Sequence, residues 1–156
     1  MRAVGALGRQ SQHAVAQGGQ DARRSPLPGR VVSCGVSIES DPRLLEQMIR
    51  NLLSNALKYT SHGKVLLGCR RHDGTLSVEI WDTGIGIPAD ELSAIFDEYH
   101  QVGNEARERN HGLGLGLSIV RRLGTLLGHQ VRVRSFPEKG SVFIIEIKLP
   151  SETATP

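Results

Sequence analysis

Two stretches of the chain carry apolar residues at helical spacing. Residues 40–60 place their apolar side chains on one face, and Asp41 followed by Pro42 is typical of a helix start. Residues 115–128 repeat the pattern, with Gly128 where a left-handed residue commonly ends a helix. We therefore predict two amphipathic helices in these stretches.

Alternation of apolar and polar residues predicts the strands. Residues 63–82 are typical of a β-hairpin whose turn is Asp73–Gly74. Single strands are predicted over three more stretches, which are residues 30–40, 129–136 and 141–149. Because strands and helices mix without regular βα alternation, we predict an α+β fold, a two-layer α/β sandwich rather than a doubly wound sheet.

Two segments lack a sustained hydrophobic period. Residues 1–29 are rich in Gly, Gln, Ser, Arg and Pro and are predicted to be a linker or disordered leading segment. The domain is then expected over residues 30–150, followed by a tail at 151–156. Inside the domain, a short predicted helix over 88–96 precedes a polar stretch, 97–112, which has almost no apolar side chains.

Composition narrows the classes of function. A chain of 156 residues with 38% hydrophobic residues fits one globular domain. Residues 1–30 carry +4 from five arginines and one aspartate, so the rest carries −1 of the net +3, which argues against a nucleic-acid partner. No apolar run approaches the roughly 18 residues of a membrane span, so no direct membrane contact is expected. The two separate cysteines favour a reduced, cytoplasmic setting.

A polar stripe borders the apolar face of the first predicted helix. At about 100° per residue, it consists of Gln47, Asn51, Asn55 and Lys58. A solvated helix face explains such a stripe. Alternatively, its amide oxygens suit a hard cation such as Mg²⁺, and Lys58 would then face substrate phosphates. The stripe by itself leaves both interpretations open.

The run GLGLGLSIV, residues 112–120, opens the second predicted helix. Unpaired N–H groups and the helix dipole favour an anion at such a position, and glycines allow close approach to a phosphate. The spacing matches neither GxGxxG nor GxxxxGK[ST], so neither a Rossmann nor a Walker site is predicted. Tight turning alone explains the glycines equally well.

The run DTGIGIP begins at Asp82, where the predicted hairpin ends. The carboxylate of Asp82 could accept a hydrogen bond from an exocyclic amine, while Gly84 and Gly86 let the backbone pass beside a flat ring. A capped turn accounts for the same three residues, since Asp starts turns and Gly with Pro fills them.

Four motifs in fixed order carry a resemblance to a known family. NLLSNALKYT, DTGIGIP, IFDEY and GLGLGLSIV resemble the four sequence boxes of the histidine kinase ATP-binding domain, within the gyrase, Hsp90 and MutL ATPase superfamily. The resemblance covers about residues 31–149. It implies a mixed, mostly antiparallel sheet backed by helices, with ATP bound between the helices and a mobile lid.

The resemblance assigns site residues by position. Asn55 resembles the Mg²⁺-binding asparagine, Asp82 looks like the aspartate that reads adenine, and Phe96 fits the phenylalanine box. Other positions implied to contact nucleotide are Lys58, Tyr59, Gly84, Gly86, Ile87, Gly112, Leu113, Gly114, Leu115, Gly116 and Leu117. The polar stretch would be the lid. The lid side chains that would reach phosphate, or simply carry solvated charge, are Arg107, Arg109 and His111.

Asn51 bears on the type of reaction. Hydrolytic relatives place a glutamate one helical turn before the metal-binding asparagine, and an amide there cannot act as a general base. Slow hydrolysis and transfer to an external protein acceptor are therefore expected, with Asn51, Asn55 and Lys58 assigned to catalysis. His13 does not match the acceptor pattern, so self-phosphorylation of this chain is not expected.

The resemblance implies the catalytic domain of a sensor or hybrid histidine kinase. Its ligands would be ATP or ADP with Mg²⁺, and its partners an acceptor-histidine helical hairpin domain and a response regulator receiver domain. The isolated domain would be a cytoplasmic monomer, with the parent kinase soluble or membrane-associated. Two alternatives are an anti-sigma-factor type of serine kinase and a nucleotide-binding module without catalysis.

Overall fold

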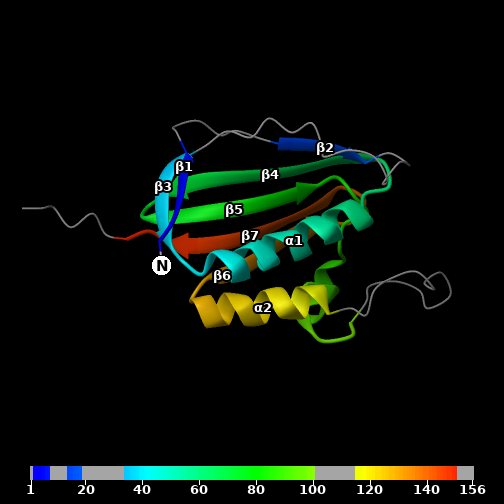
Figure 1. The fold of residues 1–156 in the computed structure, drawn as a ribbon. Coiled ribbons are helices and arrows are strands. Elements are labelled where there is room, and N and C mark those ends of the chain that lie inside the picture. Colours follow the sequence, from blue (N-terminus) through cyan, green and yellow to red (C-terminus); the bar gives the residue numbers. More distant parts are fainter. Residues whose placement is uncertain (1, 8–13, 19–33, 101–114, 151–156) are drawn as a thin grey trace, which may run out of the picture.

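The main body of the protein is a two-layer sandwich, in which two helices pack on a large β-sheet (Figure 1). A computed structural model describes residues 2–7, 14–18, 34–100 and 115–150. The helices are α1 (Pro42–Lys58) and α2 (Gly116–Leu127), with 3₁₀ turns η1 (Ala89–Glu91) and η2 (Ala94–Phe96). The strands are β1 (Arg2–Leu7), β2 (Ala14–Gly18), β3 (Cys34–Glu39), β4 (Gly63–His72), β5 (Thr75–Asp82), β6 (Gln130–Phe136) and β7 (Gly140–Lys148).

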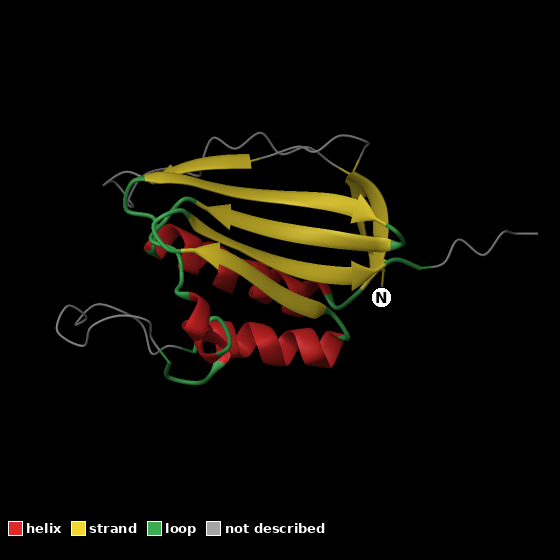
Figure 2. Cartoon of the chain, turned by 180° about the vertical axis from the view of Figure 1, so that it is seen from behind, coloured by secondary structure: helices red, strands yellow, loops and turns green. Residues whose placement is uncertain are grey.

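The main sheet has five strands in the order β2-β4-β5-β7-β6, and β1 pairs separately with β3. Both helices lie on one face of the main sheet, and the view from behind shows the other face of the sheet (Figures 1 and 2). The predicted α+β sandwich is confirmed. Every pair among the described strands is antiparallel, so the sheet is not mixed there.

The core lies between the helices and the inner face of the sheet. Its most deeply buried large side chains are Met48, Leu52, Val65, Ile80, Val120, Ile145 and Ile147. Ile145 and Ile147 are two residues apart on β7, and Met48 and Leu52 are four residues apart on α1, so each pair lies on one face of its element. None of the described helices is long and apolar enough to cross a membrane.

Local signals set the ends of both helices as predicted. The Asp41 carboxylate accepts hydrogen bonds from the N–H groups of Arg43 at 2.9 Å and Leu44 at 3.1 Å, so it caps α1. Gly128 ends α2 with a φ of 70°, and its own N–H donates back to the last turn. The turn of the β4–β5 hairpin, Asp73–Gly74, has positive φ at both residues, as a two-residue hairpin turn favours.

Two parts of the prediction differ from the structure. Residues 88–96 form two separate 3₁₀ turns rather than one short helix, because so short a run makes few α-helical hydrogen bonds to offset nucleation. The segment 1–29 was predicted without regular structure, yet β1 and β2 lie within it. They form by pairing with β3 and β4. The domain boundary at residue 30 stays a prediction.

His129 connects the start of β6 to the start of α1. The side chain is 7% exposed, and its Nε2 lies 2.8 Å from Oγ of Ser40. Burial lowers the pKa of His129 below its ordinary value of 6.5, and a hydrogen bond with the backbone of Gly128 partly opposes this shift. The folded protein therefore favours the neutral imidazole.

Acidification should destabilise the fold through His129. Because the folded-state pKa is lowered, the unfolded chain binds more protons, so stability present above pH 6.5 is lost as the pH falls below that value. Urea unfolding at about pH 7.5 and about pH 5.5 would measure this loss in the parent and in His129→Gln. An equal loss in both proteins would assign the pH dependence to other groups.

Candidate functional site

Asp82 stands at the end of β5, where the sheet passes into the loop 83–88. The side chain is 9% exposed, and its Oδ1 accepts hydrogen bonds from the N–H of Gly84 at 2.9 Å and of Ser141 at 3.3 Å. No hydrogen bond from the described residues reaches Oδ2. The second carboxylate oxygen thus remains an acceptor for a ligand.

Burial also sets the proton affinity of Asp82. Desolvation raises the pKa of Asp82 above its ordinary value of 3.8, and the two backbone hydrogen bonds from Gly84 and Ser141 oppose the rise. The folded protein therefore holds this charge at a cost in stability. A carboxylate kept at such a position is typical of a binding or catalytic group.

The structure requires glycine at positions 84 and 86 for a reason other than the one the sequence suggested. A Cβ on Gly84 would lie 2.3 Å from the carbonyl oxygen of Tyr59, so only glycine allows the loop to approach the end of α1. Gly86 has a φ of +70°, and a Cβ there would lie 2.1 Å from the carbonyl oxygen of Phe136. Contacts with the protein's own backbone account for both glycines, and their nucleotide contacts stay a prediction.

Asn55, near the end of the polar stripe of α1, faces the start of α2. The Oδ1 atom of Asn55 lies 4.0 Å from the position that a Cβ on Gly116 would occupy. The structure therefore brings the predicted metal-binding asparagine to the first turn of α2. Leu115, the residue at the N-cap, makes no side-chain hydrogen bond to that turn, so no described residue caps its N–H groups.

Two buried polar atoms on α1 and just after it have no hydrogen-bond partner among the described residues. They are Nδ2 of Asn51 and Oγ1 of Thr60, and Thr60 is only 2% exposed. Buried polar groups in folded proteins are almost always satisfied, so such orphans call for an explanation. Nδ2 of Asn51 can donate a hydrogen bond to a polar ligand or its waters, and Oγ1 of Thr60 can donate or accept one.

The end of α1 joins this region through Tyr59. The N–H of Ile85 donates to the carbonyl oxygen of Tyr59 at 3.3 Å, which ties the loop after β5 to the helix end. The Nζ atom of Lys58 lies 5.0 Å from the centroid of the Tyr59 ring. Lys58 is exposed, so its charge is available to an anion near the helix end.

Phe96 and Leu117 lie at the junction of α2 and the sheet. The Phe96 ring meets Phe143 edge-on at a centroid distance of 6.4 Å, and the guanidinium of Arg121 lies 5.9 Å from the same ring. Leu117 packs against the core, and Leu115 is the residue before α2. The structure thus gives Phe96 a packing role, and its contact with nucleotide stays a prediction.

Several predicted site residues lie outside the described part of the chain. They are Gly112, Leu113 and Gly114 of the glycine run and Arg107, Arg109 and His111 of the polar stretch. Ile87, by contrast, is placed clearly, because its N–H donates to Oγ of Ser135 at 2.8 Å.

Sequence reasoning missed three residues at this end of the sandwich, which are Thr60, Ser135 and Ser141. The register places Asp82 opposite Ser141 and Ser141 opposite Ser135, so a polar row crosses β5, β7 and β6. Strand alternation places Ser135 on the inner face with Val131 and Val133, but alternation alone does not indicate any special role for it. Its importance depends on the register, which the sequence did not reveal.

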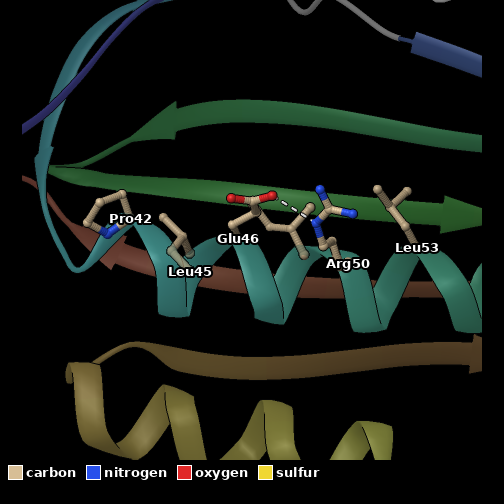
Figure 3. A pocket seen from close by; sticks show the side chains of 6 residues that line it. Pro42, Leu45, Glu46, Arg50 and Leu53 are labelled. Carbon is tan, nitrogen blue, oxygen red and sulfur yellow. Dashed lines mark hydrogen bonds and ion pairs between the residues drawn. The ribbon is translucent and has the colours of Figure 1, made fainter. Parts of the chain in front are cut away.

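A separate groove follows one side of α1 (Figure 3). It is lined by Pro42, Leu45, Glu46, Ile49, Arg50 and Leu53. An ion pair of 2.8 Å joins Glu46 to Arg50 at its rim. The groove contains none of the predicted site residues, so the candidate site is the polar end of the sandwich and not this hollow.

Comparison with known proteins identifies the family to which this chain belongs. The model of the family described as histidine kinase-, DNA gyrase B- and HSP90-like ATPase matches residues 40–151. The chain belongs to this ATPase family. The match in this ATPase domain includes α1, the loop after β5 and α2, which are the elements that carry the candidate site.

Curated relatives of this ATPase domain are sensor kinases. The sensor histidine kinase RcsC of Escherichia coli K12 is 41% identical over 114 residues, which cover 73% of this chain and 12% of RcsC. The aerobic respiration control sensor ArcB of the same strain is 40% identical over 128 residues, covering 81% of this chain and 16% of ArcB. The chain therefore spans a small part of these relatives.

Solved structures share the fold of this ATPase domain. The mycobacterial sensor histidine kinase MprB has a TM-score of 0.62 at 26% identity, with 72% of this chain and 75% of that chain covered. The catalytic domain of the histidine kinase ThkA gives 0.62 at 26% identity, covering 74% and 72%. Full-length ShkA in complex with AMPPNP gives 0.59 at 33% identity, covering 69% and 22%.

Proposed function

We propose that this chain is the ATP-binding catalytic domain of a two-component sensor histidine kinase. It would hold ATP for transfer of the γ-phosphoryl group to a histidine on a separate acceptor domain. The observation that best supports this function is Asp82, a buried carboxylate at a strand end with one oxygen that makes no hydrogen bond to the described residues. The membership in the ATPase family and the sensor-kinase relatives support the same function.

Asp82 would bind the base of the nucleotide. Its Oδ2 would accept a hydrogen bond from the exocyclic amine of adenine, whereas guanine presents a carbonyl oxygen at that position. Oδ1 is held by the N–H groups of Gly84 and Ser141, so the carboxylate is oriented before the ligand arrives. Adenine selectivity then follows from a fixed acceptor in a buried place.

Asn55 and Lys58 would bind the phosphate end. The amide oxygen of Asn55 faces the first turn of α2, which fits a hard cation that prefers oxygen ligands. Bound there, Mg²⁺ would neutralise charge on the phosphates. The exposed ammonium of Lys58 and the first N–H groups of α2, which no described side chain caps, would attract the same phosphates. Asn51 offers no general base, so this site favours transfer over hydrolysis.

A lid and two protein partners would complete this function. Arg107, Arg109 and His111, with Gly112 and Gly114, would form the lid over the phosphates. An acceptor-histidine helical hairpin and a response regulator receiver domain would be the protein partners, in the cytoplasm, with the isolated domain a monomer. The sensor-kinase relatives favour this function over a serine kinase of the anti-sigma type.

Mg²⁺ should strengthen nucleotide binding through Asn55. Titration calorimetry with ATP, with and without Mg²⁺, should show binding by the parent and a gain in affinity from the metal. In Asn55→Ala this gain should largely disappear, because the amide oxygen is removed, while ADP without metal should bind nearly as before. Ser54→Ala, an exposed change on the same helix, is the control. An undiminished gain in Asn55→Ala would remove Asn55 from the metal, and no ATP binding by the parent would overturn the proposed function.

A further inference from the structure

The polar row at the end of the sheet is organised by Ser135. Its Oγ lies 2.8 Å from Oγ of Ser141, accepts the N–H of Ile87 at 2.8 Å, and donates to the carbonyl oxygen of Gly140 at 3.0 Å. One hydroxyl of β6 therefore contacts two other segments, which are the loop after β5 and the start of β7.

The direction of these hydrogen bonds follows from counting protons. A serine hydroxyl has one proton and two lone pairs. The carbonyl oxygen of Gly140 can only accept, so the Ser135 proton goes there, and Ile87 donates into one lone pair. Ser141 must then donate its own proton into the remaining lone pair of Ser135. The hydrogen-bonding capacity of Ser135 is complete without any ligand.

The segments that Ser135 joins are those that hold Asp82. Oδ1 of Asp82 is bound by the N–H of Ser141 and by the N–H of Gly84, which belongs to the same loop as Ile87. The loop also docks on the β6–β7 turn, since the N–H of Glu138 donates to the carbonyl oxygen of Ile85 at 2.7 Å. Ser135 thus contacts both segments whose N–H groups orient the carboxylate, at Ile87 in the loop and at the side chain of Ser141 in β7.

We propose that Ser135 is a positioning residue for base selection, acting through Ser141 and Ile87 on Asp82. This inference rests on the proposed function, because it assumes that Asp82 binds adenine. Ser135 has no contact with the base in this scheme. Without its hydroxyl, the loop and the start of β7 lose this link, and the carboxylate is held less firmly in the orientation that separates an amine from a carbonyl.

The test compares ATP and GTP in Ser135→Ala and in the parent. Calorimetry gives the affinity for each nucleotide, and competition with a labelled nucleotide can replace it for the weaker ligand. The quantity compared is the ratio of the affinity for ATP to the affinity for GTP. We expect this ratio to fall about threefold to tenfold in Ser135→Ala, the loss that one or two neutral hydrogen bonds produce. Ser135→Thr keeps the hydroxyl and suits a strand, so it should restore the ratio.

Ser77→Ala is the matched control, because Ser77 is a β5 residue with no hydrogen bond to its side chain among the described residues. A proportional loss of ATP and GTP affinity in Ser135→Ala, or no loss at all, would overturn the inference and leave Ser135 with a purely structural role or none. Should Ser135→Ala fail to fold, Ser141→Ala breaks the Ser141–Ser135 link alone and should lower the same ratio. Failure of the parent to bind ATP would instead refute the proposed function.

Discussion

Asp82→Asn should lose most of the affinity for ATP without losing stability. A charge-assisted hydrogen bond to a buried group is worth about 1.5–3 kcal/mol, so the affinity should fall roughly 10-fold to 150-fold. Asparagine retains an oxygen that can accept from Gly84 and Ser141, so the local hydrogen bonds can survive. The variant also removes a desolvated charge, whose burial disfavours folding at neutral pH.

The pH dependence of stability gives an independent check on Asp82. The folded-state pKa of Asp82 is raised above 3.8, so the native protein binds a proton at this carboxylate more tightly than the unfolded chain does. The parent should therefore lose this contribution to stability as the pH rises from about 3.8 through the folded-state pKa, and Asp82→Asn should lack that loss. Asp90→Asn, a change at an exposed carboxylate, is the control. An Asp82→Asn protein that folds and binds ATP as tightly as the parent would contradict the assignment.

The helices were predictable because their signals are local. Asp41 caps N–H groups two and three residues away, and Gly128 ends α2 with its own backbone conformation. The hairpin turn at Asp73–Gly74 is equally local. In each case the residues that determine the structure are adjacent in the sequence, so no knowledge of packing was required.

The structural role of a residue is harder to predict when the residues that it contacts are far away in the sequence. Gly84 and Gly86 were predicted as nucleotide contacts, but their close neighbours are the carbonyl oxygens of Tyr59 and Phe136, on segments far away in the chain. Ser135 acquires its role only when the register aligns it with Ser141 and Asp82. β1 and β2 likewise depend on partners, since they show no sustained period of their own.

The isolated chain should bind ATP with Mg²⁺ but transfer its phosphoryl group only when an acceptor is supplied. In the proposed site, Asn51 would stand where a general base is needed to activate water, and an amide cannot take that proton. Catalysis by positioning and charge still leaves the nucleophile to come from another protein. Incubation with γ-labelled ATP should therefore label this chain very little and release phosphate slowly.

Adding a histidine-bearing helical hairpin in trans should change that outcome. The hairpin should acquire label that is lost in acid and kept in base, the behaviour of phosphohistidine. Its yield should rise with protein concentration, because no covalent tether supplies a high effective concentration. Asp82→Asn mixed with the same hairpin should give little label, since it binds ATP weakly. Acid-stable label on the chain itself would indicate serine or threonine transfer, and rapid phosphate release without an acceptor would mean that another group activates water in this site.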